Sequence, residues 1–554
     1  SGELQRPVAD DAQHTLPNFR QGDAIVLYER NADTDNVTNK MVFKGNIDYL
    51  NENEICIRLR ATQQNSSVLP SDSLYAIEHD AMDTTFRSMY QGLYAFMSAT
   101  KERRDLLLFQ REPQFDVALD KQIAEAADDF TRIALKAKAA KDYFLLVGPP
   151  GTGKTSCALK KMVETFYKEE GAQILLLSYT NRAVDEICKA LSSIRPEVDF
   201  IRVGSELSCD ENYRDHLIEN ELATCMRRTE VCERINRCRI LVGTVASISG
   251  KPELFRLKHF DVAIVDEATQ ILEPQLLGIL CAKGENGKEG VGKFILIGDH
   301  KQLPAVVLQN SEQSEVYDEA LSAVGLKNLK DSLFERLYRT ARQHTDAHRT
   351  YDMLCRQGRM HPEVALFANQ AFYEGRLLPV GLPHQLEDSG NINRLSFYPS
   401  QPEPMGSSAK TNHSEAKIAA RLAATVYKEH SEAFDASRTL GIITPYRSQI
   451  ALVKKEIEAL GIPELNQILI DTVERFQGSE RDVIIYSFCV NYPYQLKFLS
   501  NLTEEDGILI DRKLNVALTR ARKQMLLTGV PTLLERNPLY KSLLKLIESL
   551  RNIA

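Results

Sequence analysis

Residues 148–155 read Gly-Pro-Pro-Gly-Thr-Gly-Lys-Thr, and no other segment constrains the fold of this chain as strongly. The segment fits the pattern G-x-x-x-x-G-K-[ST] of a phosphate-binding loop. The apolar run Tyr143–Val147, typical of a buried strand, precedes it, and a stretch typical of a helix follows it. Glycines let backbone N–H groups close around phosphate oxygens, and the N-terminus of the helix adds positive potential. The segment therefore predicts an α/β fold with a nucleotide-phosphate site.

Each polar residue of the loop has an expected role towards ATP. Lys154 is expected to reach the β- and γ-phosphates, and Thr155 to bind Mg²⁺ through its hydroxyl. The expected nucleotide contacts are Gly148, Pro149, Pro150, Gly151, Thr152, Gly153, Lys154, Thr155 and Ser156. ATP and Mg²⁺ are therefore the predicted substrate and cofactor.

Two further apolar runs end in polar residues that suit phosphate chemistry. Val262–Val265 is followed by Asp266 and Glu267, and Phe294–Ile297 is followed shortly by Gln302. In open α/β sheets, ligands bind at the edge where the strands have their carboxyl ends. We expect Asp266 to hold Mg²⁺, Glu267 to orient and deprotonate the attacking water, and Gln302 to contact the γ-phosphate. A solvated acidic strand end is the alternative interpretation of the carboxylate pair.

Short apolar runs divide the chain into three kinds of region. About the first hundred residues are β-rich and suggest a small barrel, whereas residues from about 81 to 140 have a helical composition. After them, apolar runs alternate with helical stretches in two sets, which predicts two parallel α/β units. The polar stretches Lys283–Gly292 and Ser400–His413 are expected to be loops, the second a mobile one at the surface. The expected strands are Ala24–Tyr28, Met41–Phe43, Ile47–Tyr49, Ile55–Arg60, Leu74–Ile77, Tyr143–Val147, Ile174–Leu177, Ile240–Val242, Val262–Val265, Phe294–Ile297, Leu440–Ile443, Val483–Tyr486 and Met525–Leu527.

Composition narrows the class of protein. Hydrophobic residues make up 43% and charged residues 26% of the chain, which excludes a mainly disordered or fibrous protein. No apolar run approaches the roughly 20 residues of a membrane-spanning helix. The net charge of −8 argues against general binding of polyanions but allows a local basic groove. Since no signal-peptide pattern opens the chain, we expect a cytoplasmic protein, or a nuclear one in a eukaryote.

The ten cysteines include no C-x-x-C pair, which favours reduced thiols. Cys209, Cys225, Cys232 and Cys238 lie within 30 residues and raise the alternative of a zinc site. Their spacing does not fit a zinc ribbon or knuckle, so we favour free thiols at these positions.

Six motifs occur in order between residues 148 and 522: GPPGTGKT, VDEATQ, GDHKQLP, QGRMHP, ERFQGSERD and LNVALTRAR. Together they resemble superfamily 1 helicases, in the branch that contains the nonsense-mediated-decay RNA helicase and its DNA-processing relatives. The resemblance implies an α/β protein with two RecA-like parallel-sheet domains, an N-terminal β-barrel accessory domain and a helical connector. It also implies that ATP binds in the cleft between the two RecA-like domains and that nucleic acid crosses both.

The same resemblance implies domain boundaries. Residues 1–103 are expected to form the barrel and the start of a helical stalk. Residues 104–345 are expected to form the first RecA-like domain, with a helical insertion near 205–238, and residues 346–554 the second RecA-like domain.

The later motifs supply residues for the second side of the cleft. By resemblance, Arg359 is the arginine finger and Arg520 its partner, since a guanidinium spreads positive charge over the transition-state oxygens. Together with Lys154, Glu267 and Gln302, they are the expected catalytic residues.

Three more residues are expected at the nucleotide. Gln477 and Glu480 look like the pair that senses the γ-phosphate and holds the sugar, and Gln122 is the candidate for a base-reading glutamine. An ordinary surface glutamine is the alternative for Gln122. The family often places an aromatic residue before the finger, where its ring stacks on adenine, but this chain has Gly358. We therefore hypothesise that several nucleoside triphosphates are accepted.

Polar residues after other strands are the expected nucleic-acid contacts. They are Thr180, Asn181, Thr244, Thr444 and Pro445, whose positions resemble family motifs that touch the strand backbone. Local capping of turns by threonine and asparagine is the alternative.

Two basic segments are candidate grooves for nucleic acid. Lys327–Arg359 contains eight basic and four acidic residues, a local charge of +4, although a solvated helix face explains it equally well. Arg58 and Arg60 project from one face of a strand, towards either nucleic acid or solvent. The chain contains no tryptophan, so we expect it to hold the nucleic-acid backbone more than the bases.

The predicted function is an ATP-dependent helicase or translocase on single-stranded DNA or RNA, 5′→3′ by family analogy. An ATP-gated clamp with weak unwinding is the alternative, and a P-loop kinase leaves the later motifs unexplained. We expect a monomer without membrane partners, with protein partners or further domains outside this chain. The sequence shows no nuclease-like metal cluster and does not distinguish DNA from RNA.

Overall fold

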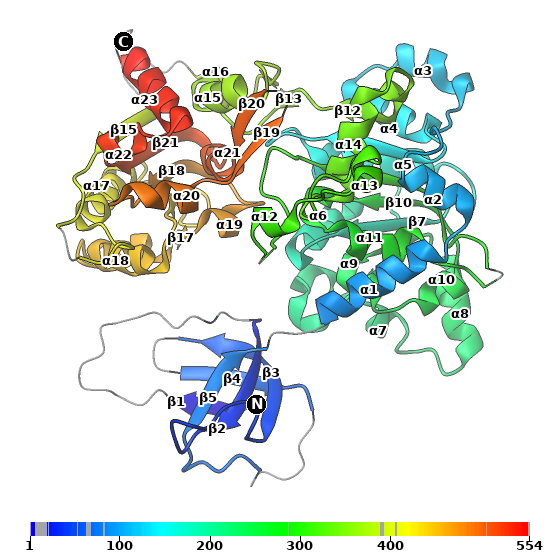
Figure 1. Cartoon of the computed structure of the whole chain (residues 1–554), viewed down its shortest axis with the longest axis horizontal. Helices are drawn as coiled ribbons and strands as arrows, with labels where there is room; N and C mark the ends of the chain where they lie inside the picture. Colours follow the sequence, from blue (N-terminus) through cyan, green and yellow to red (C-terminus); the bar gives the residue numbers. More distant parts are fainter. Residues whose placement is uncertain are drawn as a thin grey trace. The chain divides into compact units, whose positions relative to one another are not determined.

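The computed structural model describes residues 2–5, 19, 22–51, 54–61, 68–80, 84–285, 287–307, 309–387, 393–404, 407–505 and 507–551. The chain forms two compact units, Ser1–Arg87 and Ser88–Ala554, whose elements are labelled in Figure 1. Within the described part of the chain, no helix is both long and apolar enough to cross a membrane.

The first unit is a five-stranded antiparallel sheet in the order β1-β4-β3-β2-β5. Its strands are β1 (Gly2–Gln5), β2 (Ala24–Glu29), β3 (Val42–Leu50), β4 (Glu54–Leu59) and β5 (Tyr75–His79). Ile25, Leu27, Phe43, Ile47 and Ile57 form its buried core. No pairing among the described residues joins β1 to β5, so closure into a barrel stays a prediction.

Strand β3 is continuous, whereas the sequence predicted two shorter runs. Gly45 lies in its middle, where a Cβ would come within 2.8 Å of Ile57 Cγ2 and 2.9 Å of the Arg58 carbonyl oxygen. The glycine is therefore a point of close approach to β4 rather than a turn.

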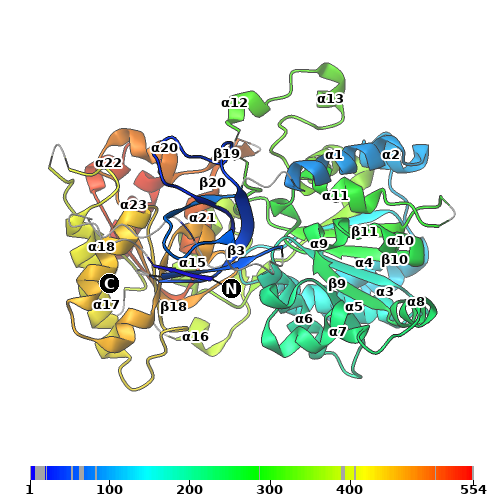
Figure 2. The ribbon, with the colours of Figure 1, turned by 90° about the horizontal axis from the view of Figure 1, so that it is seen from below.

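The second unit contains two parallel sheets, seen from two directions in Figures 1 and 2. The first sheet has seven strands in the order β12-β6-β11-β10-β7-β9-β8, all paired in parallel. These strands are β6 (Tyr143–Val147), β7 (Ile174–Ser178), β8 (Phe200–Val203), β9 (Ile240–Thr244), β10 (Phe260–Val265), β11 (Val291–Gly298) and β12 (Tyr351–Met353). β12 lies beyond residue 345, so the first sheet extends past the predicted domain boundary; this three-residue edge strand gives no apolar signal.

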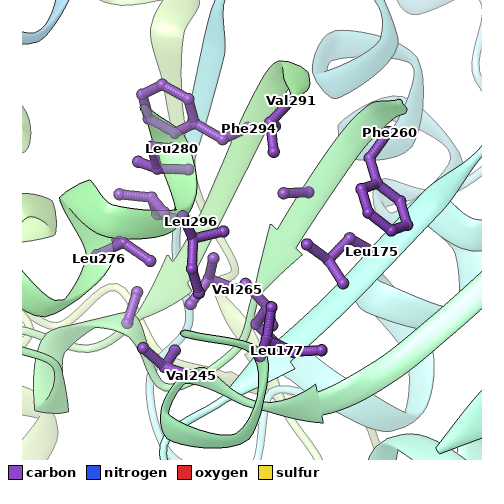
Figure 3. Packing of buried hydrophobic residues seen from close by; sticks show 14 of the residues in the cluster. Leu175, Leu177, Val245, Phe260, Val265, Leu276, Leu280, Val291, Phe294 and Leu296 are labelled. Carbon is purple, nitrogen blue, oxygen red and sulfur yellow. The ribbon is translucent and has the colours of Figure 1, made fainter. Parts of the chain in front are cut away.

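Both faces of the first sheet are buried, as the continuous apolar runs predicted. Along β6, Tyr143, Leu145 and Val147 join the core on one face, while Phe144 and Leu146 join the core on the other. Figure 3 shows the first of these cores, in which side chains of β7, β10 and β11 lie with those of α9 and α11.

Helices lie before β6 and between the strands of this sheet, and α7 and α8 lie between β8 and β9, where the sequence predicted a helical insertion. The helices are α2 (Lys101–Leu107), α3 (Asp120–Ala124), α4 (Asp129–Ala139), α5 (Lys160–Tyr167), α6 (Asn181–Ser192), α7 (Ile218–Glu221), α8 (Arg228–Arg237), α9 (Val245–Ser249), α10 (Glu253–Leu257), α11 (Glu273–Leu280), α12 (Ser311–Ser314), α13 (Glu319–Ala323) and α14 (Leu333–Gln343).

Helix α1 (Thr84–Met97) leads into the second unit and packs closely on α11. Gly92 makes this contact possible, because a Cβ at this position would lie 1.8 Å from the Pro274 carbonyl oxygen. Gly278 faces it, with its own Cβ position 3.4 Å from the Gly92 Cα. Two glycines thus let the helical connector approach the first sheet domain.

The second sheet has five parallel strands in the order β15-β21-β18-β16-β17. They are β15 (Leu395–Pro399), β16 (Leu440–Ile443), β17 (Leu469–Asp471), β18 (Arg481–Ser487) and β21 (Ala521–Gly529). Two short pairs, β13 (Arg356–Gln357) with β14 (Leu378–Pro379) and β19 (Leu502–Glu505) with β20 (Ile508–Asp511), lie outside it. Its helices are α15 (Pro362–Phe372), α16 (Pro383–Leu386), α17 (His413–Glu429), α18 (Arg447–Glu458), α19 (Val473–Phe476), α20 (Leu496–Leu499), α21 (Arg512–Leu518), α22 (Pro531–Leu534) and α23 (Pro538–Arg551).

The predicted loop at 400–413 is tied down at both ends. Ser400 and Asn412 are buried, and the Asn412 amide donates to the Gln401 carbonyl oxygen and to Asn491 Oδ1. The prediction of a mobile surface loop is therefore wrong for these ends, because buried polar groups need fixed partners. Residues 286 and 405–406 of the two predicted loops lie outside the described residues.

Candidate active site

The phosphate loop follows β6 and lies against the segment before α15. Gly151 and Gly153 have φ angles of +73° and +76°, which L-side chains rarely adopt. The Gly358 N–H donates to the Gly151 carbonyl oxygen over 2.8 Å, and a Cβ on Gly151 would lie 2.4 Å from Arg359 Cβ. The glycine pattern therefore allows the loop to contact the second sheet domain, in addition to leaving room for phosphate.

Lys154 begins the helical segment after the loop, as predicted. The first turns, Lys154–Leu159, are π-helical, and α5 continues them. The Lys154 stem lies over Gly148, whose Cβ would come within 2.1 Å of Lys154 Cγ. Lys154 Nζ reaches to 3.5 Å from Glu267 Oε1. The loop and the carboxylate pair thus form one site.

The predicted magnesium ligands are adjacent. Thr155 Oγ1 donates to Asp266 Oδ2 over 2.5 Å, and Asp266 is almost fully buried at the end of β10. Burial, with a smaller contribution from the negative charge of Glu267, raises the pKa of Asp266 to about 6. Two adjacent oxygens in a hard oxygen environment suit Mg²⁺, which usually takes one or two carboxylates from a protein.

Glu267 adopts a strained backbone conformation. Its φ angle is +53°, uncommon for a residue with a side chain. Its Oε2 accepts a hydrogen bond of 3.0 Å from Gln270 Nε2, while Lys154 lies near Oε1. These two contacts hold the carboxylate beside the phosphate loop despite the strain of the backbone. Gln270 stands in the motif VDEATQ, but the sequence alone predicted no role for it.

The end of β11 is joined to the second sheet domain by a buried hydrogen-bond network. Asp299 Oδ2 accepts from Gln302 Nε2 and from the Tyr373 hydroxyl, each over 2.7 Å. The Tyr373 oxygen in turn accepts from Asn515 Nδ2 over 2.8 Å. Arg520 Nη2 donates to Gln302 Oε1 over 3.1 Å. Gln302 and Arg520, predicted separately, therefore meet across the two domains.

Arg520 is buried, and its only described partners are oxygens. Its guanidinium donates to the carbonyl oxygens of Val516 and Ser479 and to Thr519 Oγ1. Burial, together with the nearby positive charge of Arg359, lowers the pKa of Arg520 to about 9. The group is still a cation near neutral pH.

Arg359 lies beside the phosphate loop but pairs with Glu480. Arg359 Nε donates to Glu480 Oε2 over 2.5 Å, and Arg359 Nη1 donates to the Thr519 carbonyl oxygen over 3.2 Å. Burial raises the pKa of Glu480, but the charge and hydrogen bond of Arg359 outweigh it and lower the pKa below its ordinary value. The predicted finger and the predicted sugar ligand are thus partners, and Gln477 is half-buried three residues before Glu480.

Gln122 is exposed on α3, with no hydrogen-bond partner among the described residues. The ring that lies against the phosphate loop is instead Phe130 of α4, 3.5 Å from the position of a Cβ on Gly153. Asp129 beside it forms an ion pair of 3.8 Å with Arg356, two residues before Gly358. Phe130 could not be found from the sequence, because a single phenylalanine in a helix carries no motif.

A side chain at position 358 would have little room. A Cβ on Gly358 would lie 3.2 Å from Leu382 Cδ1 and 3.3 Å from Val380 Cγ2. Both aliphatic side chains are partly exposed. They take up part of the space next to the finger that the family often gives to an aromatic ring.

The residues expected to contact nucleic acid lie after β7, β9 and β16. Thr180 and Thr244 follow or end strands that pair at Ser178↔Thr244. Each caps a helix: Thr180 Oγ1 accepts from the Ala183 N–H, and Thr244 Oγ1 accepts from the Ser247 N–H. Local capping, the alternative to nucleic-acid contact, is therefore what both hydroxyl oxygens do here. The Thr180 hydroxyl is exposed and can still donate its hydrogen to a ligand.

Thr444 differs from the other threonines. It is fully buried, and its hydroxyl has no hydrogen-bond partner among the described residues. A direct contact of this hydroxyl with a nucleic-acid backbone does not fit such burial. Pro445 and Asn181 are half-buried at their strand and helix ends.

The two basic segments form ion pairs within the protein. Arg58 pairs with Asp48 over 3.0 Å and Arg60 with Asp80 over 3.5 Å. Between 327 and 359 the pairs are Arg336–Glu273, Arg339–Asp331, Arg342–Glu505, Arg349–Asp120, Arg356–Asp129 and Arg359–Glu480. Six of the eight basic residues are thus paired, five with acids outside the segment and Arg339 with Asp331 inside it, so the segment does not present its full charge of +4 to a ligand.

The cysteines are free thiols, and Cys209 and Cys238 are buried. Among the residues that the structure describes, no group of three or more histidine, cysteine, aspartate or glutamate side chains is placed to hold a metal ion.

Comparisons with known proteins support the same class. Two family models, each described as an AAA domain, match residues 125–231 with 220–310, and residues 329–532. The Bos taurus protein named DNA replication ATP-dependent helicase/nuclease DNA2 is 27% identical over 96% of this chain and 50% of its own length. The Homo sapiens protein of that name is 28% identical over 87% of this chain and 46% of its own. The chain thus spans about half the length of these relatives.

Of two other similarities, one covers a smaller share of this chain and the other is a weak structural likeness. The Saccharomyces cerevisiae protein named DNA polymerase alpha-associated DNA helicase A is 26% identical over 74% of this chain and 65% of its own. The structure titled Arterivirus nonstructural protein 10 (helicase) covers 96% of this chain and 77% of its own, at 13% identity and a TM-score of 0.37. That structural likeness is too low to bear on function.

Two parallel sheets, a phosphate loop and a network joining them define a P-loop protein with two RecA-like domains. Its ordered motifs and its relatives assign it further. The chain belongs to superfamily 1 of the helicases, in the branch that contains the nonsense-mediated-decay RNA helicase and the DNA2 proteins.

Proposed function

We propose that this chain is a nucleic-acid-dependent ATPase that translocates along single-stranded DNA or RNA and separates duplexes. The observation that carries the proposal is the bridge from Asp299 and Gln302 to Tyr373 and Arg520, since it ties the nucleotide edge of one domain to the other. Hydrolysis at such a site is coupled to the relative position of the two domains. DNA is the favoured track, because the similar curated proteins are named as DNA helicases.

The residues of the site have distinct roles in this proposal. Backbone N–H groups of the phosphate loop and Lys154 bind the phosphates of ATP. Glu267, held by Gln270, accepts a proton from the attacking water. Arg359 and Arg520 stabilise negative charge that develops on the transferred phosphoryl oxygens. Arg359 must exchange its Glu480 partner for phosphate, so that Glu480 becomes available to the sugar.

Thr155 and Asp266 would hold Mg²⁺, which supplies charge neutralisation at the β- and γ-phosphates. Burial of Asp266 favours the neutral acid, so bound cation is expected to stabilise its ionised form. Their adjacent oxygens support this assignment.

Nucleobase selection is expected to be loose. Position 358 is a glycine and has no ring to stack on a base, and the Gln122 side chain is exposed, with no hydrogen-bond partner among the described residues. The Phe130 ring lies beside the loop, with its Cζ 3.5 Å from the position of a Cβ on Gly153, and every nucleobase has a π-face that can stack on such a ring. We expect similar hydrolysis rates with ATP and GTP, and a Phe130→Ala variant with a raised KM for both. A strong preference for ATP in the unaltered protein would contradict this mechanism.

Thr180 and Asn181 would contact the nucleic-acid backbone from the first domain, and Pro445 from the second, whereas Thr244 is buried like Thr444 and fits this role less well. Translocation in the 5′→3′ direction is proposed from family resemblance. Duplexes with a single 5′ or 3′ overhang test the direction, and exclusive use of 3′ overhangs would refute it. A cytoplasmic or nuclear location and a monomeric state stay predictions from the sequence.

The primary experiment is steady-state ATP hydrolysis without nucleic acid, with single-stranded DNA and with single-stranded RNA. Stimulation by one polymer is expected, and Glu267→Gln should lower kcat by about a hundredfold or more. Turnover that survives in Glu267→Gln without stimulation by either polymer would overturn the proposal. Stimulation without strand separation would favour the ATP-gated clamp instead.

A further inference from the structure

An exposed cluster of aromatic side chains follows β18. Tyr492 and Tyr494 have ring centroids 5.8 Å apart and planes only 13° from parallel. Phe498 meets the Tyr494 ring edge-on, at 6.5 Å and 86°. Tyr494 is 54% and Phe498 66% exposed, although apolar rings of this size are usually covered. We call Tyr492, Tyr494 and Phe498 the aromatic cluster.

The cluster is held in place by buried hydrogen bonds. Gln495, between its members, is buried, and its Oε1 accepts from the N–H groups of Asn491 and Tyr492, each over 2.9 Å. Gln495 Nε2 donates to the Ala409 carbonyl oxygen over 2.6 Å and lies 3.2 Å from the Tyr446 hydroxyl. Because the hydrogen bonds of the buried Gln495 fix the backbone that carries these rings, the rings can present a fixed face to a ligand.

The cluster also lies at a defined edge of the second sheet. β18 ends at Ser487, five residues before Tyr492, and its neighbour β16 ends at Ile443. Tyr446, which Gln495 contacts, begins the turn into α18 just after Pro445. The carboxyl ends of these strands are the edge at which the proposed function puts nucleic acid.

Three lysines lie close to the cluster along the chain or through hydrogen bonds. Lys497 is exposed within it, and Lys513 Nζ donates to the Phe498 carbonyl oxygen over 3.3 Å. Lys410 is exposed, and its carbonyl oxygen accepts from Ser448 of α18. Glu474 pairs with Lys513 and Glu403 with His413, so Lys497 and Lys410 supply the positive charge near the cluster in the described part of the chain. Aromatic faces among cations are the pattern of sites that bind single-stranded nucleic acid by stacking.

We propose that the aromatic cluster is a stacking platform for the bases of single-stranded nucleic acid on the second RecA-like domain. This inference rests on the proposed function. It differs from the expectation that the chain holds the nucleic-acid backbone more than the bases, which rested on the absence of tryptophan. With Thr444 buried, the cluster supplies the second domain's grip through base faces, which every sequence offers.

The absence of tryptophan allows a direct test. A Tyr494→Trp variant carries the single tryptophan of the chain, and a base that stacks on it should quench its emission. The probes are a pyrimidine oligodeoxynucleotide of roughly 16 residues and an abasic oligonucleotide of equal length. Tyr317→Trp is the matched control, because Tyr317 is 80% exposed and lies outside the cluster. Quenching is expected only for Tyr494→Trp and only with the oligonucleotide that has bases.

Affinity gives the second measurement. Tyr494→Ala and Phe498→Ala should each weaken binding of the base-containing oligonucleotide about tenfold, but leave the abasic one unchanged. Both rings are exposed, so neither variant should disturb folding. Equal losses on both oligonucleotides, or no loss on either, would overturn the stacking platform, and the second result would point to a protein partner. Failure of the proposed function is a separate result, in which the unaltered protein binds neither oligonucleotide.

Discussion

Replacement of Glu415 by glutamine is expected to stabilise the second RecA-like domain at neutral and alkaline pH. Glu415 is fully buried in the first turn of α17. Its Oε2 accepts from Ser487 Oγ over 2.7 Å and from the Cys489 N–H over 2.8 Å, while Oε1 accepts from Ser400 Oγ over 3.4 Å. None of these donors is charged, so burial dominates and raises the pKa of Glu415 to about 7.

The sign and size of the effect follow from this raised pKa. Below about pH 4.5 the acid is protonated in the folded and unfolded states, and it has no effect. Between about 4.5 and 7 the folded state keeps a proton that the unfolded state releases, so stability falls as pH rises. Because a tenfold change in proton affinity corresponds to about 1.4 kcal/mol, the loss of stability between pH 5 and pH 8 is about 2.5 kcal/mol.

A Glu415→Gln variant should remove that loss. Its amide oxygen can keep the two bonds at the Oε2 position, and its NH₂ can donate to the Ser400 hydroxyl. The difference in unfolding temperature between variant and unaltered protein should grow by roughly 5–10 °C from pH 5 to pH 8. Differential scanning calorimetry over this pH range measures it, because groups common to both proteins cancel.

A matched control is Glu429→Gln, an exposed acid at the other end of α17. It removes the same charge from the same helix and should give a difference that does not vary in this way. If the Glu415→Gln difference were also constant with pH, burial would not control this carboxyl and the reasoning would fail.

Two further predictions concern packing and coupling. Gly92→Ala gains about 1 kcal/mol of helix propensity, but overpacking against the Pro274 carbonyl oxygen costs about 1–3 kcal/mol or more. The unfolding temperature should therefore fall, and the exposed Gln91→Ala is the control. An unchanged midpoint of thermal unfolding would contradict the close contact. Tyr373→Phe removes one buried hydrogen bond between the domains, to Asp299, and one within the second domain, from Asn515, so kcat for ATP should fall about tenfold while folding is kept. Unchanged turnover and unchanged stimulation by nucleic acid would show that this bridge does not couple the domains.

Sequence reasoning succeeded where a local pattern has a physical cause. Apolar runs buried on both faces predicted the central strands, because parallel sheets are covered on both sides. Asp266 and Gln302 were found because carboxyl ends of such strands share an edge. The edge strands β8, β12, β15 and β17 were missed, because a polar residue interrupts each short apolar run: Arg202, Asp352, Ser396 and Asp471.

Pairing between distant residues was beyond the sequence. Arg336 looked like part of a basic surface, yet it is buried against Glu273. Lys293 is similar: its ammonium donates to the carbonyl oxygens of Ala137, Lys138 and Ala140 and so caps the C-terminus of α4 from another strand. Burial lowers the pKa of Lys293 to about 8. Such partners are set by the fold, and the charge of one segment does not reveal them.

The hydrogen bond from the Gly358 N–H to the Gly151 carbonyl oxygen has a consequence for how this enzyme can diverge. It joins the two domains through main-chain atoms, so it needs an N–H group at position 358, which proline lacks. A residue larger than glycine keeps this N–H but needs Leu382 and Val380 to move. Under the proposed function, the link between the domains and the space beside the nucleotide therefore depend on different atoms of one residue.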